Sequence, residues 1–319
     1  MDCTNKLKVI VGDATIGVRG ENFSYIFSGG RIGMESLVRD GKEWLYRTPM
    51  PTFWRALTDN DRGNRFAHKS GMWLSADCFI KCVNIAAKID DAPVAMPLSP
   101  ANNAYGGDVE AERAEVCFVY ETITVPATQV TVTYEVYVGG DIHVRVHYAG
   151  KEGLPELPVF GMRFIMPTCA DRYRYEGLSG ETYPDRMAGG IPGVYEIQGL
   201  PVTPYLVPQD CNVHMQTKWV EVYRSTAQDN SYKEKKESGI RFRAEDGHDF
   251  AFACIPYTAL ELESATHQEE LPPARRTVLT VLGAVRGVGG IDSWGADVET
   301  PYHISAEKDI DYGFWIGGV

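Results

Sequence analysis

Hydrophobic and polar residues alternate with a period of two along much of this chain. The alternation is clearest in three successive stretches, residues 115–125, 128–138 and 142–148. Pro126 separates the first stretch from the second, and the pair Gly139 and Gly140 separates the second from the third. Because a period of two places alternate side chains on opposite faces of a strand, the pattern predicts three antiparallel strands with one buried face.

Shorter stretches of the same kind predict further strands at residues 15–18, 22–27, 32–38, 159–166, 218–224, 240–244, 250–255 and 278–283. The Asp-Gly pairs at 40–41 and 246–247 are typical of hairpin turns. Helical periodicity is scarce. Residues 61–77 predict one short helix with Phe66, Met72 and Trp73 on its apolar side, and residues 260–263 and 265–269 predict one more turn. Residues 93–107, rich in Ala, Asn and Pro, are predicted to form a loop.

Strands that do not alternate with helices argue against a parallel βαβ fold. The chain has 319 residues, which is enough to bury a sizeable core. At this length, two stacked large antiparallel sheets are more economical than two small sandwiches. We therefore expect an all-β fold in which residues 1–319 form a single domain.

The charge balance argues against several classes of function. Lys and Arg number 31 against 43 Asp and Glu, a net charge of -12, whereas nucleic-acid binding depends on clustered basic side chains. The basic run at 233–236 is interrupted by Glu234 and predicts a solvated loop. No apolar run approaches the roughly 18 residues of a membrane span. The seven cysteines are scattered, and the start of the chain is charged; together these features predict a cytoplasmic protein.

Residues 52–63 combine aromatic and strongly polar side chains in one segment, namely Phe53, Trp54, Arg55, Asp59, Asn60 and Asp61. In a structural interpretation, the aromatic side chains enter the core. The Asp and Asn side chains then bond the local backbone and shape a tight turn. A metal site at Asp59 and Asp61 is a weaker alternative, because no complete loop of oxygen ligands follows them.

Two further segments carry candidate chemistry. Residues 287–295 place Trp294 in a glycine-rich stretch that can approach a ligand closely. An exposed tryptophan is a good platform for the apolar face of a hexose, and the alternative is a core tryptophan whose N–H is satisfied. Residues 175–186 end in Asp185 and Arg186, which are expected to pair with each other or with a neighbouring strand.

These segments resemble three motifs of the C-terminal domain of family 2 β-galactosidases. Residues 52–63 resemble FWRAPTDNDRG, residues 287–295 resemble GxGGDDSWG, and residues 175–186 resemble GxGPxENYPDR. Ile291 stands where the family usually has an acid, and Ser179 and Thr182 also depart from the pattern. Residues 203–210 resemble TPYxxPQENG up to Cys211. The resemblance therefore spans most of the chain.

The resemblance implies a galactose mutarotase-like supersandwich of large antiparallel sheets. It also implies that Trp294 and Asp292 are substrate-binding residues for the galactoside, with Asp292 as a brace for the loop. A contact face or pocket wall beside the sugar is implied for Trp54, Arg55, Asp59, Asn60, Asp61, Glu181, Tyr183, Asp185 and Arg186.

No catalytic residue is predicted in this chain. A retaining glycosidase needs two carboxyl groups about 5 Å apart across the sugar. In the family both come from a barrel for which this chain has no room. Glu181 is considered as a base, but the family match makes it a structural or interface residue. No cofactor is predicted.

The histidines and cysteines predict no further site. His143, Arg145 and His147 are expected on one solvated sheet face, whereas His214 and His267 fall in loops beside acids. No spacing singles out a proton-transfer pair. Two more residues, Cys78 and Cys82, lie four apart; without a second Cys or His pair to complete a zinc site, they are expected to be buried, reduced thiols.

The leading hypothesis is the small subunit of a two-chain β-galactosidase, inactive alone. A partner chain with the barrel would supply the acid/base and the nucleophile, while this chain closes the galactoside pocket and excludes water. Two alternatives stay open: an autonomous carbohydrate-binding module, and an aldose 1-epimerase-like enzyme.

Overall fold

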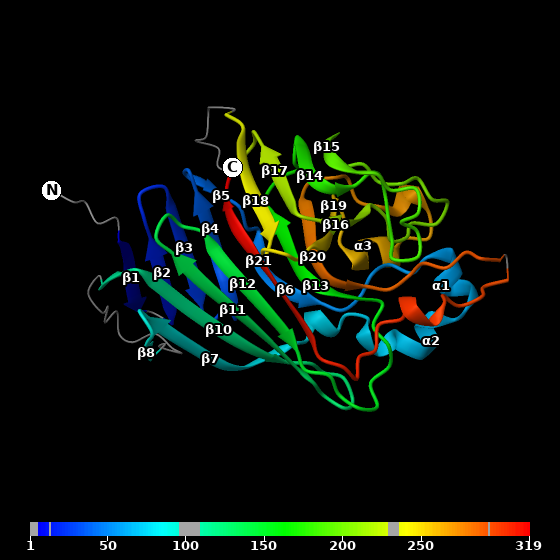
Figure 1. The fold of residues 1–319 in the computed structure, drawn as a ribbon, viewed down its shortest axis with the longest axis horizontal. Helices are drawn as coiled ribbons and strands as arrows, with labels where there is room; N and C mark the ends of the chain where they lie inside the picture. The colour runs from blue at the N-terminus through cyan, green and yellow to red at the C-terminus, as the bar shows by residue number, and fades with distance from the viewer. Residues whose placement is uncertain (1–5, 13, 96–108, 229–235, 293) are drawn as a thin grey trace.

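The computed structural model describes residues 6–12, 14–95, 109–228, 236–292 and 294–319. Within these ranges the strands form three antiparallel sheets, with short helical segments at one end (Figure 1). The predicted loop at 93–107 and the basic run at 233–236 lie largely outside the described residues. None of the described helices has the length and apolar character required to span a bilayer.

The largest sheet crosses the whole molecule and has ten strands among the described residues. Its order is β15 (Pro192–Gln198), β14 (Arg172–Leu178), β17 (Trp219–Arg224), β18 (Ser238–Ala244), β21 (Ile310–Gly318), β12 (Ile142–Tyr148), β11 (Gln129–Tyr137), β10 (Arg113–Glu121), β7 (Lys81–Ile89) and β8 (Ala92–Val94). The predicted three-stranded meander is confirmed as β10, β11 and β12, with register Phe118 opposite Val132 and Val132 opposite Val146.

Two smaller sheets complete the described strands. The first has the order β5 (Lys42–Glu43), β4 (Gly33–Arg39), β3 (Phe23–Ser28), β2 (Thr15–Arg19), β1 (Leu7–Gly12) and β9 (Val109–Ala111). The second has the order β16 (Val213–Thr217), β19 (Phe250–Ile255), β20 (Thr277–Val285), β13 (Val159–Met166) and β6 (Arg47–Thr52). The expectation of two stacked sheets is therefore corrected to one large sheet and two smaller ones.

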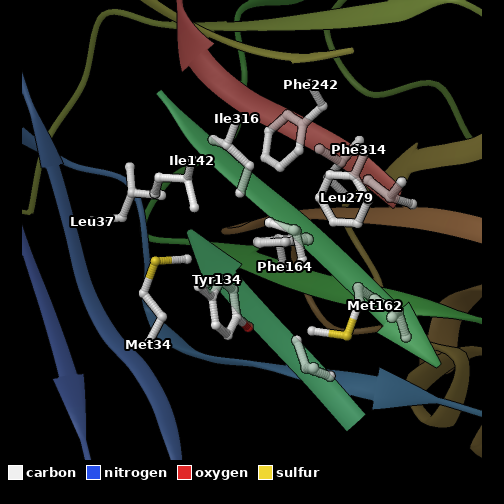
Figure 2. Packing of buried hydrophobic residues seen from close by; sticks show 14 of the residues in the cluster. Met34, Leu37, Tyr134, Ile142, Met162, Phe164, Phe242, Leu279, Phe314 and Ile316 are labelled. Carbon is white, nitrogen blue, oxygen red and sulfur yellow. The ribbon is translucent and has the colours of Figure 1, made fainter. Parts of the chain in front are cut away.

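Both smaller sheets pack on the same face of the large sheet. Phe27 of β3 lies 5.4 Å from Tyr134 of β11, and Phe164 of β13 lies 5.0 Å from Phe242 of β18, measured between ring centroids. One cluster of buried side chains contains residues from all three sheets. Figure 2 shows such side chains from β4, β11, β12, β13, β18, β20 and β21 meeting in one place. The all-β prediction with large antiparallel sheets is confirmed.

The single helix predicted at 61–77 is wrong. The structure has α1 (Asp59–Gly63), α2 (Phe66–Ser70) and two 3₁₀ turns, η1 (Gly71–Trp73) and η2 (Ala76–Cys78). Arg65 and Ser75 have φ of 61°, and these left-handed residues interrupt a continuous helix. Phe66 and Trp73 are buried as predicted, but Met72 is 41% exposed.

The remaining local predictions have mixed outcomes. Asp40 and Gly41 connect the paired strands β4 and β5, so that hairpin is confirmed. The turn at 246–247 is not a hairpin, because β18 belongs to the large sheet and β19 to a smaller one. The predicted turn near 260–269 is found as α3 (Ala259–Ser264) and η3 (Gln268–Glu270), and one more 3₁₀ turn, η4, covers Thr300–Tyr302.

Candidate functional site

The loop that follows β20 presents Trp294 to solvent. Its side chain is 86% exposed, so the alternative of a core tryptophan is wrong. Gly289, Gly290 and Gly295 have φ of 70°, 82° and 81°, a left-handed conformation that other residues avoid. The loop runs beside α1 at the end of the molecule opposite β1 (Figure 1). The glycines thus let a short loop fold back and leave its tryptophan outside.

Helix α1 holds this loop from one side. Thr58 caps the helix, because its hydroxyl accepts a hydrogen bond from the Asp61 N–H and the Asp61 carboxylate accepts one from the Thr58 N–H. Asn60 then donates from Nδ2 to the carbonyl of Val288 at 2.9 Å. A Cβ placed on Gly63 would lie 2.9 Å from Cα of Gly295. The polar residues Thr58, Asn60 and Asp61 therefore stabilise both α1 and the adjacent loop.

Two buried arginines share one buried carboxylate beneath the loop. Asp61 lies 2.9 Å from Arg55 and 3.4 Å from Arg286. Burial disfavours the charge of Arg55, but Asp61 and neighbouring carboxylates outweigh this and raise the pKa of Arg55. Arg55 also donates to the carbonyl of Gly287 at 3.1 Å. The ion-pair network therefore reaches the first residue of the glycine-rich segment.

Arg286 ties the two ends of the loop together. Its Nε lies 3.2 Å from Glu156, and its guanidinium pairs with Asp297 beyond the tryptophan. Burial alone would raise the pKa of Asp297, but hydrogen bonds from Lys69 and Arg286 lower it to about 2. Arg286 and Asp297 were not singled out in the sequence. The available signal was an arginine placed directly before a run of glycines.

The motif at residues 175–186 holds the loop from the other side. The carboxylate of Asp185 accepts hydrogen bonds from the N–H groups of Val288 at 3.0 Å and Gly289 at 2.7 Å. Arg186 donates to the carbonyl of Gly289. Asp185 and Arg186 were expected to pair with each other or with a strand. In the structure their side chains instead bind the backbone of the tryptophan loop.

Glu181 and Tyr183 brace the segment behind Asp185. The Glu181 carboxylate accepts hydrogen bonds from Thr203 Oγ1 at 2.8 Å and from the Asn212 N–H at 2.7 Å. Tyr183 donates its hydroxyl to Asp210 at 2.9 Å. Burial raises the pKa of Asp210 to about 6, against the opposing effects of Arg55 and this hydrogen bond. These side chains link the third motif to the segment that precedes β16.

Trp54 lies inside the fold and is 4% exposed. Its indole N–H donates to Glu263 of α3 at 3.2 Å, and the same carboxylate accepts the N–H of Leu57 at 2.8 Å. Asp59 is different, because its side chain is 68% exposed and pairs with Arg62 at 3.1 Å. The first motif thus divides into a buried half that supports the loop and an exposed half at the surface.

Asp292 braces the tip of the loop, as the sequence suggested. Its Oδ1 accepts hydrogen bonds from the N–H groups of Trp294 at 2.9 Å and Ala296 at 3.1 Å. These backbone hydrogen bonds lower the pKa of Asp292. Ile291, beside it, is 62% exposed. The carboxylate therefore stays ionised and orients the tryptophan backbone.

Two expectations about histidine and cysteine are corrected. His214 lies in β16 rather than in a loop, and burial lowers its pKa to about 4. Cys78 is exposed and Cys82 half-buried rather than buried, although both are free thiols. His267 does lie in a loop, 3.1 Å from Glu270. No cluster of His, Cys, Asp or Glu able to hold a metal ion occurs within the described ranges.

The fold and this site define an all-β protein of large antiparallel sheets that displays one tryptophan on a braced, glycine-rich loop. Residues 19–316 match the family described as "Beta galactosidase small chain". The chain belongs to this β-galactosidase small-chain family.

Individual relatives agree with this family. The chain is 59% identical over 314 residues to "Beta-galactosidase small subunit" of Latilactobacillus sakei, covering 98% of both chains. It is 33% identical over 321 residues to "Beta-galactosidase" of Halalkalibacterium halodurans, covering 98% of this chain and 28% of that protein. The chain thus corresponds in length to the first relative and spans about 28% of the second.

Two solved structures are similar to this chain at low sequence identity. A galactose mutarotase-like protein from Lactobacillus casei has a TM-score of 0.42 at 10% identity, covering 96% of this chain and 100% of that one. A putative aldose 1-epimerase from Escherichia coli K12 has a TM-score of 0.44 at 10% identity, covering 98% of both chains.

Proposed function

We propose that this chain acts as the small subunit of a two-chain β-galactosidase and completes the galactoside pocket of its partner. The partner would be a larger chain that carries the acid/base and nucleophilic carboxylates. Trp294 would contact the sugar and close one wall of the pocket. The names of the relatives support the assignment to a β-galactosidase and to its small subunit. The site geometry supports the role of the loop.

The observation that carries this proposal is an exposed tryptophan on a loop that is fixed in place. Trp294 is 86% exposed, whereas the loop backbone around it is hydrogen-bonded to Arg55, Asn60, Asp185 and Arg186. An aromatic face binds the apolar side of a hexose. A loop that is already ordered loses little entropy when it binds. This combination favours a binding surface over a flexible linker.

The same end of the molecule offers apolar side chains for docking. Leu206 is 88% exposed and Ile291 is 62% exposed. The segment that carries Leu206 is joined to α1, because Gln209 accepts the N–H of Asp59 at 2.7 Å and Arg62 donates to the carbonyl of Pro208 at 3.2 Å. Exposed apolar groups around a structured site are typical of protein–protein contacts. They support a partner chain seated on this end.

The chemistry proposed for this chain is positioning rather than bond-making. Asp185 and Asp292 lie in or beside the loop, but each accepts two backbone hydrogen bonds from it. These carboxylates are therefore occupied in holding the loop. A wall that fixes the sugar and excludes water increases the rate of a reaction carried out by groups on the partner.

The test is hydrolysis of a chromogenic β-galactoside by the purified chain, by its large partner chain, and by the two together. We expect activity in the mixture far above that of either chain alone, with a co-eluting complex in gel filtration. Equal activity of the large chain with and without this chain would refute the proposal. Activity of this chain alone would place a catalytic carboxylate pair within it.

A second candidate is an autonomous galactoside-binding module, which the exposed Trp294 also supports. It differs in needing no partner for its affinity. Saturable binding of methyl β-D-galactoside by the chain alone, quenching tryptophan fluorescence and lost in Trp294→Ala, would favour it. We expect binding by the chain alone to be weak, because the larger chain would form most of the pocket.

We place the complex in the cytoplasm. All six cysteines within the described ranges are free thiols, which fits a reducing compartment.

A further inference from the structure

A hollow lies against strands β11, β12 and β21 of the ten-stranded sheet. Its volume is about 540 Å³, within the range of sites that hold small molecules. Strands β11, β12 and β21 form its floor, and the connection from β18 to β19 together with Gly283 of β20 forms one side. None of its lining residues belongs to the three motifs that surround Trp294.

The strand register explains how Glu245 comes to line the hollow. Side chains on this face form three rows across β11, β12 and β21: Thr131–His147–Asp311, Thr133–Arg145–Gly313 and Glu135–His143–Trp315. The middle row ends in a glycine, so one position in the array has no side chain. A Cβ at Gly313 would lie 2.3 Å from Glu245 Oε1. The gap therefore admits Glu245, which reaches over the sheet from the end of β18.

The walls are held in place before any ligand arrives. His143 lies between two carboxylates, 3.1 Å from Glu135 and 2.6 Å from Glu245. Its ring stacks on Trp315 with centroids 4.5 Å apart. On the other side of the gap, His147 lies 2.8 Å from Asp311. Such mutual hydrogen bonds fix side chains in one geometry, which lowers the entropic cost of binding.

Several polar groups in the hollow are still available. The hydroxyl groups of Thr131 and Thr133 and the ring of His248 form no hydrogen bond with another residue in the part of the chain that the structure describes. A threonine hydroxyl both donates and accepts, and a carboxylate accepts strongly from a hydroxyl group. The hollow thus offers donors and acceptors of the kinds that match the hydroxyl groups of a polyol.

The charges disfavour an anionic ligand. Glu245, Asp249 and Asp311 line the hollow, against one guanidinium, Arg145. Arg145 is itself paired, 3.4 Å from Glu135. Phosphate or carboxylate recognition needs an excess of positive charge or backbone N–H groups. A metal ion is not favoured either, because no metal-binding cluster occurs among the described residues.

We propose that this hollow is a second ligand site, which binds a neutral, polyhydroxylated molecule of hexose size. Thr133, Arg145 and Asp311 contact its hydroxyl groups, and Gly313 leaves room for the Glu245 side chain that forms part of the wall. The site does not depend on Trp294 or on a partner chain. Without a free aromatic face in its lining, its affinity comes from hydrogen bonds and falls in the millimolar range.

The test is titration of the full chain with D-galactose and D-glucose, followed by backbone amide NMR up to about 100 mM, well above the expected dissociation constant. We expect saturable shifts at β11, β12 and β21 in the wild type. Thr133→Val keeps a β-branched side chain on the strand and removes the hydroxyl, and Asp311→Asn removes the charge. Each should weaken binding roughly 5- to 10-fold, the effect of losing one hydrogen bond.

Controls separate this site from the tryptophan loop. Trp294→Ala should leave the shifts at β11, β12 and β21 unchanged, and inorganic phosphate should not displace the sugar. The proposal is overturned if neither hexose binds saturably there. It is also overturned if both pocket variants bind like the wild type, or if phosphate competes. Because the readout is binding by the chain alone, it is independent of activity in the two-chain complex.

Discussion

At the scale of single residues, Asp61 joins three parts of the chain. Its backbone N–H and carboxylate start helix α1 through the capping box with Thr58. The same carboxylate pairs with both Arg55 and Arg286, which are buried. Burying a guanidinium without a partner is strongly unfavourable. The tryptophan loop therefore depends on a side chain that the loop itself does not contain.

Asp61→Asn should strongly destabilise the fold. Asparagine keeps the size and an acceptor for the cap, but it takes the paired carboxylate from buried Arg55 and one of three carboxylates from buried Arg286. We expect a loss of about 3–5 kcal/mol in the free energy of unfolding, the usual cost of breaking a buried ion pair. Urea denaturation measures it. The matched control is Asp59→Asn, two residues away and exposed, which should cost less than about 1 kcal/mol. Equal losses in both variants would contradict this account.

Two buried groups near the site affect stability with opposite dependence on pH. The pKa of Asp210 is raised by burial from 3.8 to about 6. Its contribution to stability is therefore complete below about pH 4 and is lost as the pH rises through 6. The pKa of His214 is lowered by burial from 6.5 to about 4. Its contribution is complete above about pH 6.5 and is lost as the pH falls through 4.

These opposing effects should cancel in the wild type and separate in variants. In Asp210→Asn, the free energy of unfolding should rise with pH between 4 and 6.5, because only His214 remains. In His214→Gln it should fall over the same range. Each change should approach roughly 3 kcal/mol, since one pKa unit corresponds to about 1.4 kcal/mol. Urea denaturation at several pH values measures the slopes, and parallel profiles for both variants would contradict the assignment.

At the scale of elements, α1 and the tryptophan loop contact each other backbone to backbone. Gly63 ends α1, and a Cβ on Gly295 would lie 2.4 Å from the carbonyl carbon of Gly63. Neither position tolerates a side chain without movement of the other segment. The two glycines therefore set the distance between helix and loop, and through it the position of Trp294.

Gly63→Ala should displace the loop while leaving the sheets intact. The new methyl group would lie 2.9 Å from Gly295 Cα, so the loop must move outwards. We expect kcat/KM of the two-chain complex to fall on the order of 10- to 100-fold, as small displacements of a positioning group do. The control is Gly71→Ala, where no neighbouring atom of the described residues lies within 4 Å of the new Cβ. Full activity of Gly63→Ala would argue against a positioning role for the loop.

Elements with clean alternation could be predicted from the sequence, and elements with interrupted patterns could not. Strands β10 to β12 were predicted because their apolar residues alternate without interruption. The last strand, β21, was missed because Gly313 and Gly317 interrupt its pattern. The same Gly313 makes room for Glu245 in the wall of the hollow beside β11, β12 and β21, which only the register of these strands reveals. The motifs identified the candidate site. They did not reveal that its charged side chains bind the backbone of the tryptophan loop.

At the scale of the whole molecule, the three sheets share one core. Phe164 of a smaller sheet contacts Phe242 and Phe314 of the large sheet, at centroid distances of 5.0 Å and 6.1 Å. The connection from β18 to β19 crosses directly from the large sheet to a smaller one. Contacts of this kind couple the sheets energetically. The prediction that residues 1–319 form a single domain therefore requires cooperative unfolding.

Phe164→Ala should destabilise the whole chain at once. The side chain is 1% exposed, so its removal leaves a cavity that costs about 3–5 kcal/mol. Circular dichroism and tryptophan fluorescence should report one shared transition, shifted equally. Ile123→Ala, at a position 47% exposed, should change stability by less than about 1 kcal/mol. Separate transitions for the two probes would instead indicate independent domains.

The central claim is that this chain contributes a sugar-binding wall to a partner's active site. The most direct measurement is hydrolysis of a chromogenic β-galactoside by the large chain mixed with the wild type or with Trp294→Ala, alongside sedimentation of each complex. We predict unchanged assembly and a fall in kcat/KM on the order of 10- to 100-fold, a loss of about 1.4 kcal/mol per factor of ten. Unchanged kcat/KM in a fully assembled Trp294→Ala complex would contradict the account.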